Sequence, residues 1–329
     1  MENSSFAANE TFRYTYEDMY EGYTNEAVLI IEILMVLWIS IGNSLVIAAY
    51  WKYERLQTVA NFFVIQLAIA DLCVGASLVY MMMLSSFVLP EIGEKSIIIC
   101  ITSQILLVLP TLVSLLFLLV ITIDRYMAIF YPLKYPSIMT KRRMQYLVAG
   151  LWIGTTLYIA ISTMDSILYN TSTSQHNICV GDKGNIDPRI MGYTYLPLFL
   201  VIVILVVVLY IRILWTVKKQ LDKHNSNDST NLQKNIQLIK TAVLVIGLFV
   251  ICWAPFVVLA SGYEMNFFST NQKQNMFILY MVFYHIAVMN SGMNFIVYPV
   301  RSKDFRDGFR TVLYCKERSS VNTTGPDCC

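Results

Sequence analysis

The sequence predicts an all-α membrane protein: a seven-transmembrane helix bundle with a short amphipathic helix after the seventh span. The chain of 329 residues is 56% hydrophobic and only 14% charged, whereas a soluble domain carries about 25% charged residues. Its mean hydropathy is +0.56. The charged residues are also segregated, because they collect between seven long apolar windows.

Each apolar window is long enough to cross about 30 Å of hydrocarbon as an α-helix. The predicted spans are 27–51, 59–86, 97–130, 143–164, 191–217, 237–262 and 275–299. The segments between them are short, so no soluble domain is expected. The chain is therefore predicted to have three parts: an extracellular segment 1–26, the bundle 27–299, and a surface helix with a cytoplasmic tail over 300–329.

The last part begins with an amphipathic pattern. Apolar residues recur among Lys and Arg at helical spacing, at Phe305, Phe309, Val312 and Leu313. This pattern is typical of a helix that lies on a membrane surface. Cys315 directly follows it and is a predicted palmitoylation site.

The distribution of basic residues predicts the orientation. Of 24 Lys and Arg residues, five lie in the N-terminal segment and in the loops on its side of the membrane. The other nineteen lie at the opposite face, where the positive-inside rule places the cytoplasm. The protein is thus predicted to be a multi-pass plasma-membrane protein with an extracellular N-terminus. Residues 1–26 show no cleavable signal peptide, so the first span is expected to direct insertion.

Extracellular modifications follow from this orientation. Glycosylation sequons on the predicted outside begin at Asn3, Asn9 and Asn170. Cys100 opens the third span, and Cys179 lies in the loop before the fifth. A predicted disulfide between them would tie this loop over the bundle.

Polar side chains inside the spans are the candidates for function, because an ionisable group in lipid is costly. Asp71 lies in the second span, and the polar residues of other spans include Asn43, Ser114, Asn290 and Asn294. A carboxylate among hydroxyl and amide groups can bind a small cation such as sodium or hold a proton. The same groups can instead serve only as interhelical hydrogen bonds, and the residues alone leave both interpretations open.

Two further features lie in the third and sixth spans. Asp124 and Arg125 are expected to form an intrahelical ion pair at the cytoplasmic end, which keeps the guanidinium available to another partner. The alternative is an Arg that extends to lipid head groups. In the sixth span Pro255 is predicted to bend the helix beside the bulky Trp253, either as a hinge or only for packing.

Together these features resemble the rhodopsin-like (class A) G-protein-coupled receptors, over residues 27–315. The matching positions are Gly42-Asn43, Leu67 to Asp71, Cys100, Asp124-Arg125-Tyr126, Trp152, Cys252-Trp253 with Pro255, and Asn294 with Tyr298 and Phe305. Residues 56–64 and 70–75, with Glu32, are similar to adenosine receptors, and the melanocortin and trace-amine-like branches are also close. The resemblance implies a receptor that converts binding of an extracellular ligand into activation of a heterotrimeric G protein. Arrestin and membrane lipids are further expected partners; neither enzymatic activity nor nucleic-acid binding is expected.

The resemblance also implies roles for individual residues. An allosteric sodium ion is expected at Asp71 and Ser114, in a pocket completed by Trp253, Asn290 and Asn294. The activation switch is expected to comprise Asp124, Arg125, Tyr126, Tyr210, Trp253, Pro255 and Tyr298. Contact with the G protein is expected at Arg125, Pro132 and Leu133. The ligand pocket is expected to be lined by Leu107, Val108, Thr111, Asp182, Phe256 and Tyr284.

The chain departs from the family pattern at several positions. Phe295 replaces the proline of the seventh span, and Ile202 that of the fifth. Where some members place an acid that pairs with Arg125, this chain has Lys234-Asn235, so measurable basal signalling is expected.

The ligand is only partly constrained. Leu107 occupies the position of the amine-receptor aspartate, and Val288 that of the opsin lysine, which argues against a monoamine and against retinal. Ala260 and Gly181 replace the two adenine-binding residues of adenosine receptors. The predicted pocket favours a small, partly hydrophobic ligand, whereas the acidic N-terminal segment favours a cationic peptide. Glu32 is expected either to pair with His285 or to face water.

Other classes fit less well. The three histidines have no metal-ligand spacing, which argues against an intramembrane enzyme. No internal repeat typical of a transporter is evident. A polytopic transporter or channel without G-protein coupling remains the alternative prediction.

Overall fold

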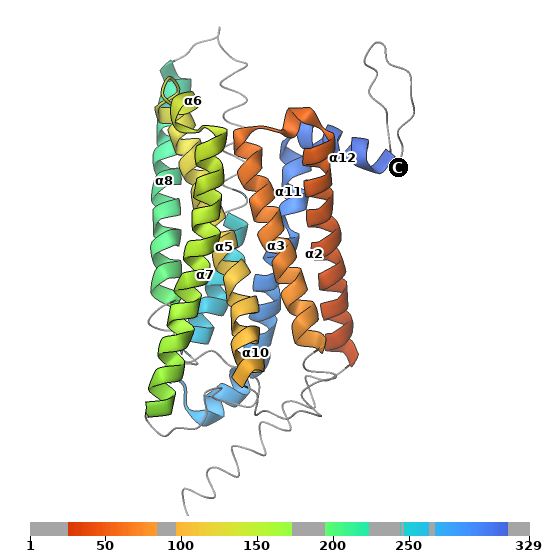
Figure 1. The fold of residues 1–329 in the computed structure, drawn as a ribbon, viewed down its shortest axis with the longest axis vertical. Helices are drawn as coiled ribbons and strands as arrows, with labels where there is room; N and C mark the ends of the chain where they lie inside the picture. The colour runs from red at the N-terminus through yellow and green to blue at the C-terminus, as the bar shows by residue number, and fades with distance from the viewer. Residues whose placement is uncertain are drawn as a thin grey trace, which may run out of the picture.

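The computed structural model describes residues 26–83, 97–172, 195–223, 244, 247–262 and 267–314, and these contain no β-strand. The elements are α2 (Glu26–Lys52), the 3-10 turn η1 (Glu54–Leu56), α3 (Val59–Met83), α5 (Ile97–Phe130), α6 (Tyr135–Ile138), α7 (Lys141–Ser172), α8 (Leu196–Lys223), a helix over Gly247–Gly262, α10 (Thr270–Met289), the 3-10 turn η4 (Asn290–Gly292), α11 (Asn294–Arg301) and α12 (Lys303–Tyr314). Figure 1 shows the long helices side by side, with α6 and α12 at the same end of the bundle.

The predicted membrane-spanning bundle is confirmed. Within the described residues, α2, α3, α5, α7 and α8 are each long and apolar enough to cross a membrane. The shorter apolar helices Gly247–Gly262 and Ile278–Gly292 lie within the predicted sixth and seventh spans.

Several boundaries differ from the prediction. Helix α7 continues to Ser172 instead of ending at 164. Helix α8 runs from Leu196 to Lys223 and so ends beyond the predicted 217, whereas the predicted start at 191 lies outside the described residues. The seventh span is not one helix, because the 3-10 turn η4 separates α10 from α11.

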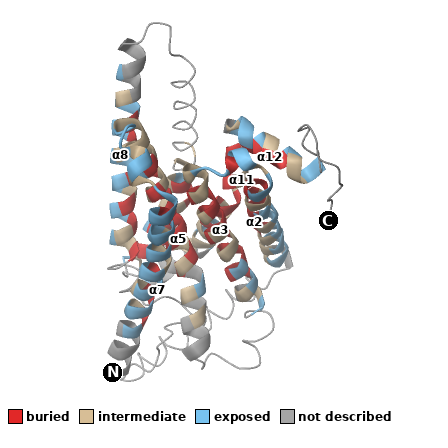
Figure 2. Cartoon of the chain, turned by 45° about the horizontal axis from the view of Figure 1, so that its top comes forward, coloured by how far each residue is buried: buried red, intermediate tan, exposed pale blue. Residues whose placement is uncertain are grey.

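The core lies where α3 packs against α2 and α5, and where α5 packs against α7 and α8. Buried residues are concentrated between these helices, whereas α7 and α8 are largely exposed (Figure 2). The exposed side chains on α7 and α8 include large apolar ones such as Ile153, Ile161 and Trp215. An apolar outer surface is what a helix facing lipid requires.

Helix α12 packs against α2 at the end of the bundle. It buries Phe305 and Phe309 in the protein, whereas Leu313 stays exposed. At Gly308 an added Cβ would lie only 2.8 Å from Leu56 Cδ1, so the glycine permits this close approach. The predicted helix is therefore present, but much of its apolar face covers protein rather than lipid.

The break before α11 is matched by hydrogen-bond donors on α2. The N–H of Ile296 donates to the carbonyl three residues back (3.1 Å) instead of the carbonyl of Gly292. The Gly292 carbonyl accepts from Trp38 Nε1 at 2.9 Å. Asn43 Nδ2 donates to the Ser291 carbonyl, also at 2.9 Å. Because an unpaired carbonyl in lipid is costly, these two side chains stabilise the break.

Phe295 packs directly onto α2. Its ring lies edge-on to Trp38, with 5.0 Å between the ring centroids. A Cβ added at Gly42 would overlap the Phe295 ring. The glycine at position 42 is thus required by the aromatic side chain at position 295.

We expect Gly42→Ala to destabilise the protein, because the added methyl group and the Phe295 ring compete for the same space. Overpacking of this kind costs about 1–3 kcal/mol. The measurement is the melting temperature in detergent, and Gly42→Ala combined with Phe295→Ala should recover part of the loss.

The matched control is Gly154→Ala, because a Cβ added there has no neighbour within 4 Å. That variant should melt at or above the wild-type temperature, since Ala favours helix over Gly. An unchanged melting temperature for Gly42→Ala would contradict the packing described here.

Candidate functional site

The carboxylate of Asp71 on α3 is buried with no solvent exposure. Ser114 Oγ on α5 donates to its Oδ1 at 3.2 Å. Asn294 Nδ2, at the start of α11, donates to its Oδ2 at 2.7 Å. The Ser291 side chain in η4 also hydrogen-bonds to Asp71. One side chain of α3 is therefore connected to three other helical segments.

This cluster overlaps only partly with the predicted sodium pocket. Ser291 was missed, although it lies three residues before Asn294 and so about one helical turn away. Asn290 is buried in η4. Trp253 stacks on Phe249 at 6.0 Å and so belongs to an aromatic row along the helix Gly247–Gly262.

The oxygen atoms of Asp71 and its neighbours suit a small hard cation. One carboxylate and the hydroxyl groups of Ser114 and Ser291 supply oxygen ligands, which hard cations prefer. Among the described residues, no group of three or more His, Cys, Asp or Glu side chains could hold a metal ion. A single carboxylate matches the charge of a monovalent ion, so the residues fit sodium.

A second buried carboxylate, that of Asp124, lies near the C-terminal end of α5. Arg125 Nη2 lies 3.5 Å from its Oδ2, so the expected ion pair is present. Tyr135 Oη in α6 donates to its Oδ1 at 2.7 Å. Burial raises the pKa of Tyr135, and the Asp124 carboxylate raises it further. The phenol is therefore the hydrogen donor at neutral pH, and it ties α6 to α5.

The other predicted switch residues lie in separate packing environments. The Tyr126 ring stacks on Phe130 at 4.2 Å. Tyr210 is buried in α8. Tyr298 stacks on Phe305 of α12 at 5.1 Å, which joins α11 to α12. Pro255 lies inside the helix Gly247–Gly262, which continues past it.

The turn between α5 and α6 is open to solvent. Leu133 is 95% exposed, and Pro132 is also exposed. An isolated, fully exposed leucine of this kind is available to a partner.

The predicted ligand-pocket residues fall into two groups. Phe256 lies 5.7 Å from Tyr284 and 5.4 Å from Tyr280, measured between ring centroids. Val108 instead packs in a cluster with Ile159 and Tyr195. Tyr280 was not predicted; it lies one turn before Tyr284, which is the sequence signal that points to it.

The remaining pocket residues are less defined. Thr111 is half-buried in α5. The side chain of Leu107 and all of Asp182 lie outside the described part of the chain.

Glu32 lies beside His285, which was one of the two predictions for Glu32. His285 Nε2 is 3.7 Å from Glu32 Oε1, which is an ion-pair distance between α2 and α10. His285 Nδ1 lies 2.7 Å from the Met281 carbonyl. With Nδ1 protonated and bonded to this carbonyl, Nε2 faces the carboxylate.

Several predicted sites lie outside the described residues. They are the sequons at Asn3 and Asn9, the loop cysteine Cys179, the Lys234-Asn235 pair and Cys315. Cys100 and Asn170 lie within α5 and α7, but their side chains are not described. The predicted glycosylation, disulfide and palmitoylation sites therefore stay predictions.

The sequence is similar to known membrane receptors. The family model "7 transmembrane receptor (rhodopsin family)" matches residues 42–298. Adenosine receptor A2b of Homo sapiens is 29% identical over 319 residues, which cover 88% of this chain and 91% of the relative. Adenosine receptor A2a of Canis lupus familiaris is 26% identical over 304 residues, covering 86% and 71%. Adenosine receptor A2b of Gallus gallus is 26% identical over 306 residues, covering 87% of both chains.

We expect Tyr135→Phe to lower the melting temperature, because the buried Asp124 carboxylate would lose its neutral donor. A hydrogen bond to a charged group contributes about 1.5–3 kcal/mol. Since burial raises the pKa of Tyr135, the loss should be constant across the neutral pH range.

The control is Tyr131→Phe, because Tyr131 is 46% exposed in the same segment. Its melting temperature should match the wild type. An unchanged melting temperature for Tyr135→Phe would show that the Tyr135 hydroxyl does not stabilise the Asp124 carboxylate.

Proposed function

This chain belongs to the rhodopsin family of seven-transmembrane receptors, and on that premise we propose how its residues convert ligand binding into activation of a heterotrimeric G protein. It is a G-protein-coupled receptor related to the adenosine receptors. The observation that carries the proposal is the Arg125 guanidinium beside the buried Asp124 carboxylate, at the end of the bundle that also presents Leu133.

The proposed orientation has α6 and α12 on the cytoplasmic side of the plasma membrane. The excess of Lys and Arg at that face supports it. The same orientation exposes the N-terminal segment and the ligand-binding end of the bundle to the outside.

In the resting state the Arg125 guanidinium is paired with Asp124. An agonist that binds a second arrangement more tightly shifts the population toward it, by no more than its differential affinity. In that arrangement Arg125 leaves Asp124, Tyr210 and Tyr298 repack, and a cytoplasmic cleft opens. The exposed Pro132 and Leu133 then contact the G-protein alpha subunit, and arrestin is a second cytoplasmic partner.

The Asp71 cluster is proposed to set the balance between the two arrangements. Asp71, Ser114 and Ser291 would hold the sodium ion. The ion would supply positive charge beside the buried carboxylate. The hydrogen bonds from Ser114 and Asn294 already join α3 to α5 and α11, and these segments must shift relative to one another when the switch operates.

The ligand is proposed to be a small, partly hydrophobic molecule that contacts Phe256 and Tyr284. The closely spaced aromatic rings of Tyr280, Tyr284 and Phe256 support an apolar contact surface with phenol groups. The relatives are named for adenosine. In this chain, however, the fully buried Ala260 offers no side-chain hydrogen bond to a purine. Adenosine must therefore be tested as a ligand, but we do not expect it to be the agonist.

The test is ligand-stimulated guanine-nucleotide exchange on purified G proteins of the main alpha classes. The screen should include adenosine, other small molecules and cationic peptides. We expect Arg125→Ala to lower the exchange rate by more than about tenfold. In the open arrangement Arg125 is proposed to contact the G protein, and truncating one partner of a charged interface contact costs about 2–5 kcal/mol, where 1.4 kcal/mol is about tenfold.

The control is Arg142→Ala, because Arg142 lies on the outside of α7 and stacks on Tyr146 at 5.7 Å. Both variants should reach the cell surface in normal amounts. Wild-type exchange by Arg125→Ala would remove the proposed switch.

We expect sodium chloride to lower agonist-free exchange by the wild type more than choline chloride does, and Asp71→Asn to abolish this difference. The amide keeps the shape of the carboxylate but removes the charge that attracts a cation. Exchange in the two salts at equal ionic strength provides the measurement.

Asp307→Asn is the matched control, since Asp307 is a partly exposed carboxylate on α12 paired with Arg310. It should respond to sodium as the wild type does. A sodium effect that persisted in Asp71→Asn would place the ion elsewhere.

A further inference from the structure

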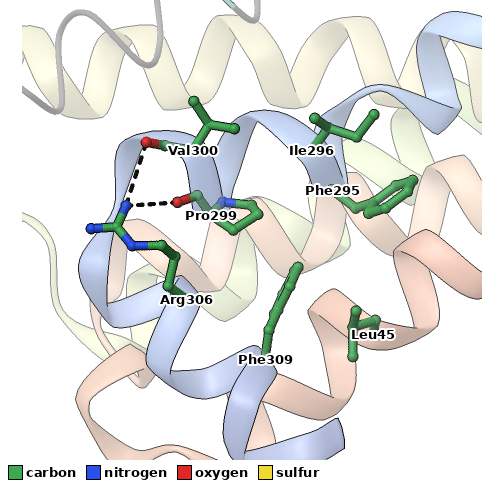
Figure 3. A pocket seen from close by; sticks show the side chains of 7 residues that line it. All are labelled: Leu45, Phe295, Ile296, Pro299, Val300, Arg306 and Phe309. Atoms are coloured by element: carbon green, nitrogen blue, oxygen red, sulfur yellow. Dashed lines mark hydrogen bonds between the residues drawn. The ribbon is translucent and has the colours of Figure 1, made fainter.

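A groove of about 440 Å³ lies between α2, α11 and α12. It is lined by Leu45, Phe295, Ile296, Pro299, Val300, Arg306 and Phe309. Its volume falls within the range of about 300–1,000 Å³ typical of small-molecule sites. In Figure 3 Arg306 lies at one end of the groove and Phe295 at the other.

The groove opens toward the surface that lipid covers. Val300 is 64% exposed, Ile296 is 38% exposed, and Ile41 on the neighbouring part of α2 is 66% exposed. Since these are large apolar side chains on a membrane-spanning bundle, hydrocarbon is the medium that reaches them.

Phe295 and Gly308 shape this groove. The Phe295 ring is turned toward Gly42 and Trp38 of α2, so one end of the groove is aromatic. Gly308 brings α12 close to Leu56 and α2, which positions Phe309 as a second aromatic wall. The groove therefore belongs to the packed structure rather than to a loop.

Arg306 is the one charged residue of the lining. Its Nη1 donates to the carbonyls of Pro299 at 2.8 Å and Val300 at 3.4 Å (Figure 3). A guanidinium carries five N–H donors, and within the described part of the chain those on Nε and Nη2 stay open to another acceptor. The neighbouring acid, Asp307, is paired with Arg310 at 3.6 Å.

The surrounding segments add to this positive charge. Residues 52–56 and 299–314 together carry six basic and three acidic side chains. An apolar groove with a guanidinium at its end matches a molecule that has a hydrocarbon chain and an anionic phosphate head group.

We propose that this groove binds an anionic phospholipid of the leaflet on the α12 side, with one acyl chain along the apolar walls and the phosphate on Arg306. An acyl chain gains little by leaving other acyl chains, so charge decides which lipid is bound. A basic side chain near an anionic membrane surface contributes about 1 kcal/mol, which corresponds to roughly fivefold enrichment over a zwitterionic lipid.

The test uses the full chain in bilayers containing equal amounts of phosphatidylcholine and phosphatidylserine. A photoreactive group is carried near the end of an acyl chain, either on phosphatidylserine or on phosphatidylcholine, and labelled residues are mapped by mass spectrometry. We expect phosphatidylserine to label residues 295–300 and Leu45 roughly fivefold more than phosphatidylcholine does.

Two sets of variants separate the effect of the charge from that of the groove. Arg306→Gln should remove the preference and Arg306→Lys should keep most of it, while Arg310→Gln on the same helix should behave as wild type. Leu45→Trp should reduce labelling by filling the groove, whereas Ile41→Trp, one turn away and outside the lining, should not.

Three outcomes would overturn the proposal. Equal labelling by both lipids would remove the charge selectivity. Loss of labelling when cholesterol is added would assign the groove to a sterol, and cross-links between two copies of the chain would assign it to a dimer. Because no G protein is present, each result is independent of the proposed signalling function.

Discussion

The structure depends on one constraint: a polar group inside a lipid-embedded bundle must find its partner within the protein. Asp71 shows this most directly. Its carboxylate has no solvent exposure, and it accepts hydrogen bonds from Ser114 and Asn294. These bonds fix the relative positions of α3, α5 and α11. A change of charge at Asp71 therefore acts on all three helices at once.

The same constraint explains the unusual end of the seventh span. The 3-10 turn η4 shifts the backbone hydrogen bonding, and Trp38 and Asn43 of α2 pair with the carbonyls at the break. Phe295 then packs over Gly42. Helix α2 therefore holds α11 through both polar and aromatic contacts, and the groove beside α12 is a consequence of that arrangement.

The apolar outer surface of the bundle limits where partners can bind. The outward faces of α7 and α8 are exposed (Figure 2) and carry large apolar side chains, as a surface that faces lipid requires. Partners dissolved in water can therefore approach only the two ends of the bundle. The end that carries α6 presents the Asp124–Arg125 pair and Leu133, while the aromatic rings of Phe256, Tyr280 and Tyr284 lie toward the other end. The chain belongs to the rhodopsin family of seven-transmembrane receptors, and the proposed function requires that these two ends be coupled.

The spans, the buried Asp71 and the Asp124–Arg125 pair could be predicted, because each depends on residues that are neighbours in sequence or on local hydrophobicity, while the orientation stays a prediction. The family resemblance further indicated that Ser114 and Asn294 lie near Asp71. It did not indicate Ser291, and it grouped Val108 with Phe256 although the two pack in different clusters.

The sequence by itself determined the number of spans, their approximate limits and the few polar groups available to carry a function. Tertiary structure alone decided that the seventh span breaks at η4, that Phe295 faces Gly42, and that a groove remains between α2, α11 and α12. The physical reason is that a membrane helix is apolar on its lipid face as well as on its buried face, so its sequence pattern does not reveal how it is rotated. Contacts between helices, not periodicity along them, settle that rotation.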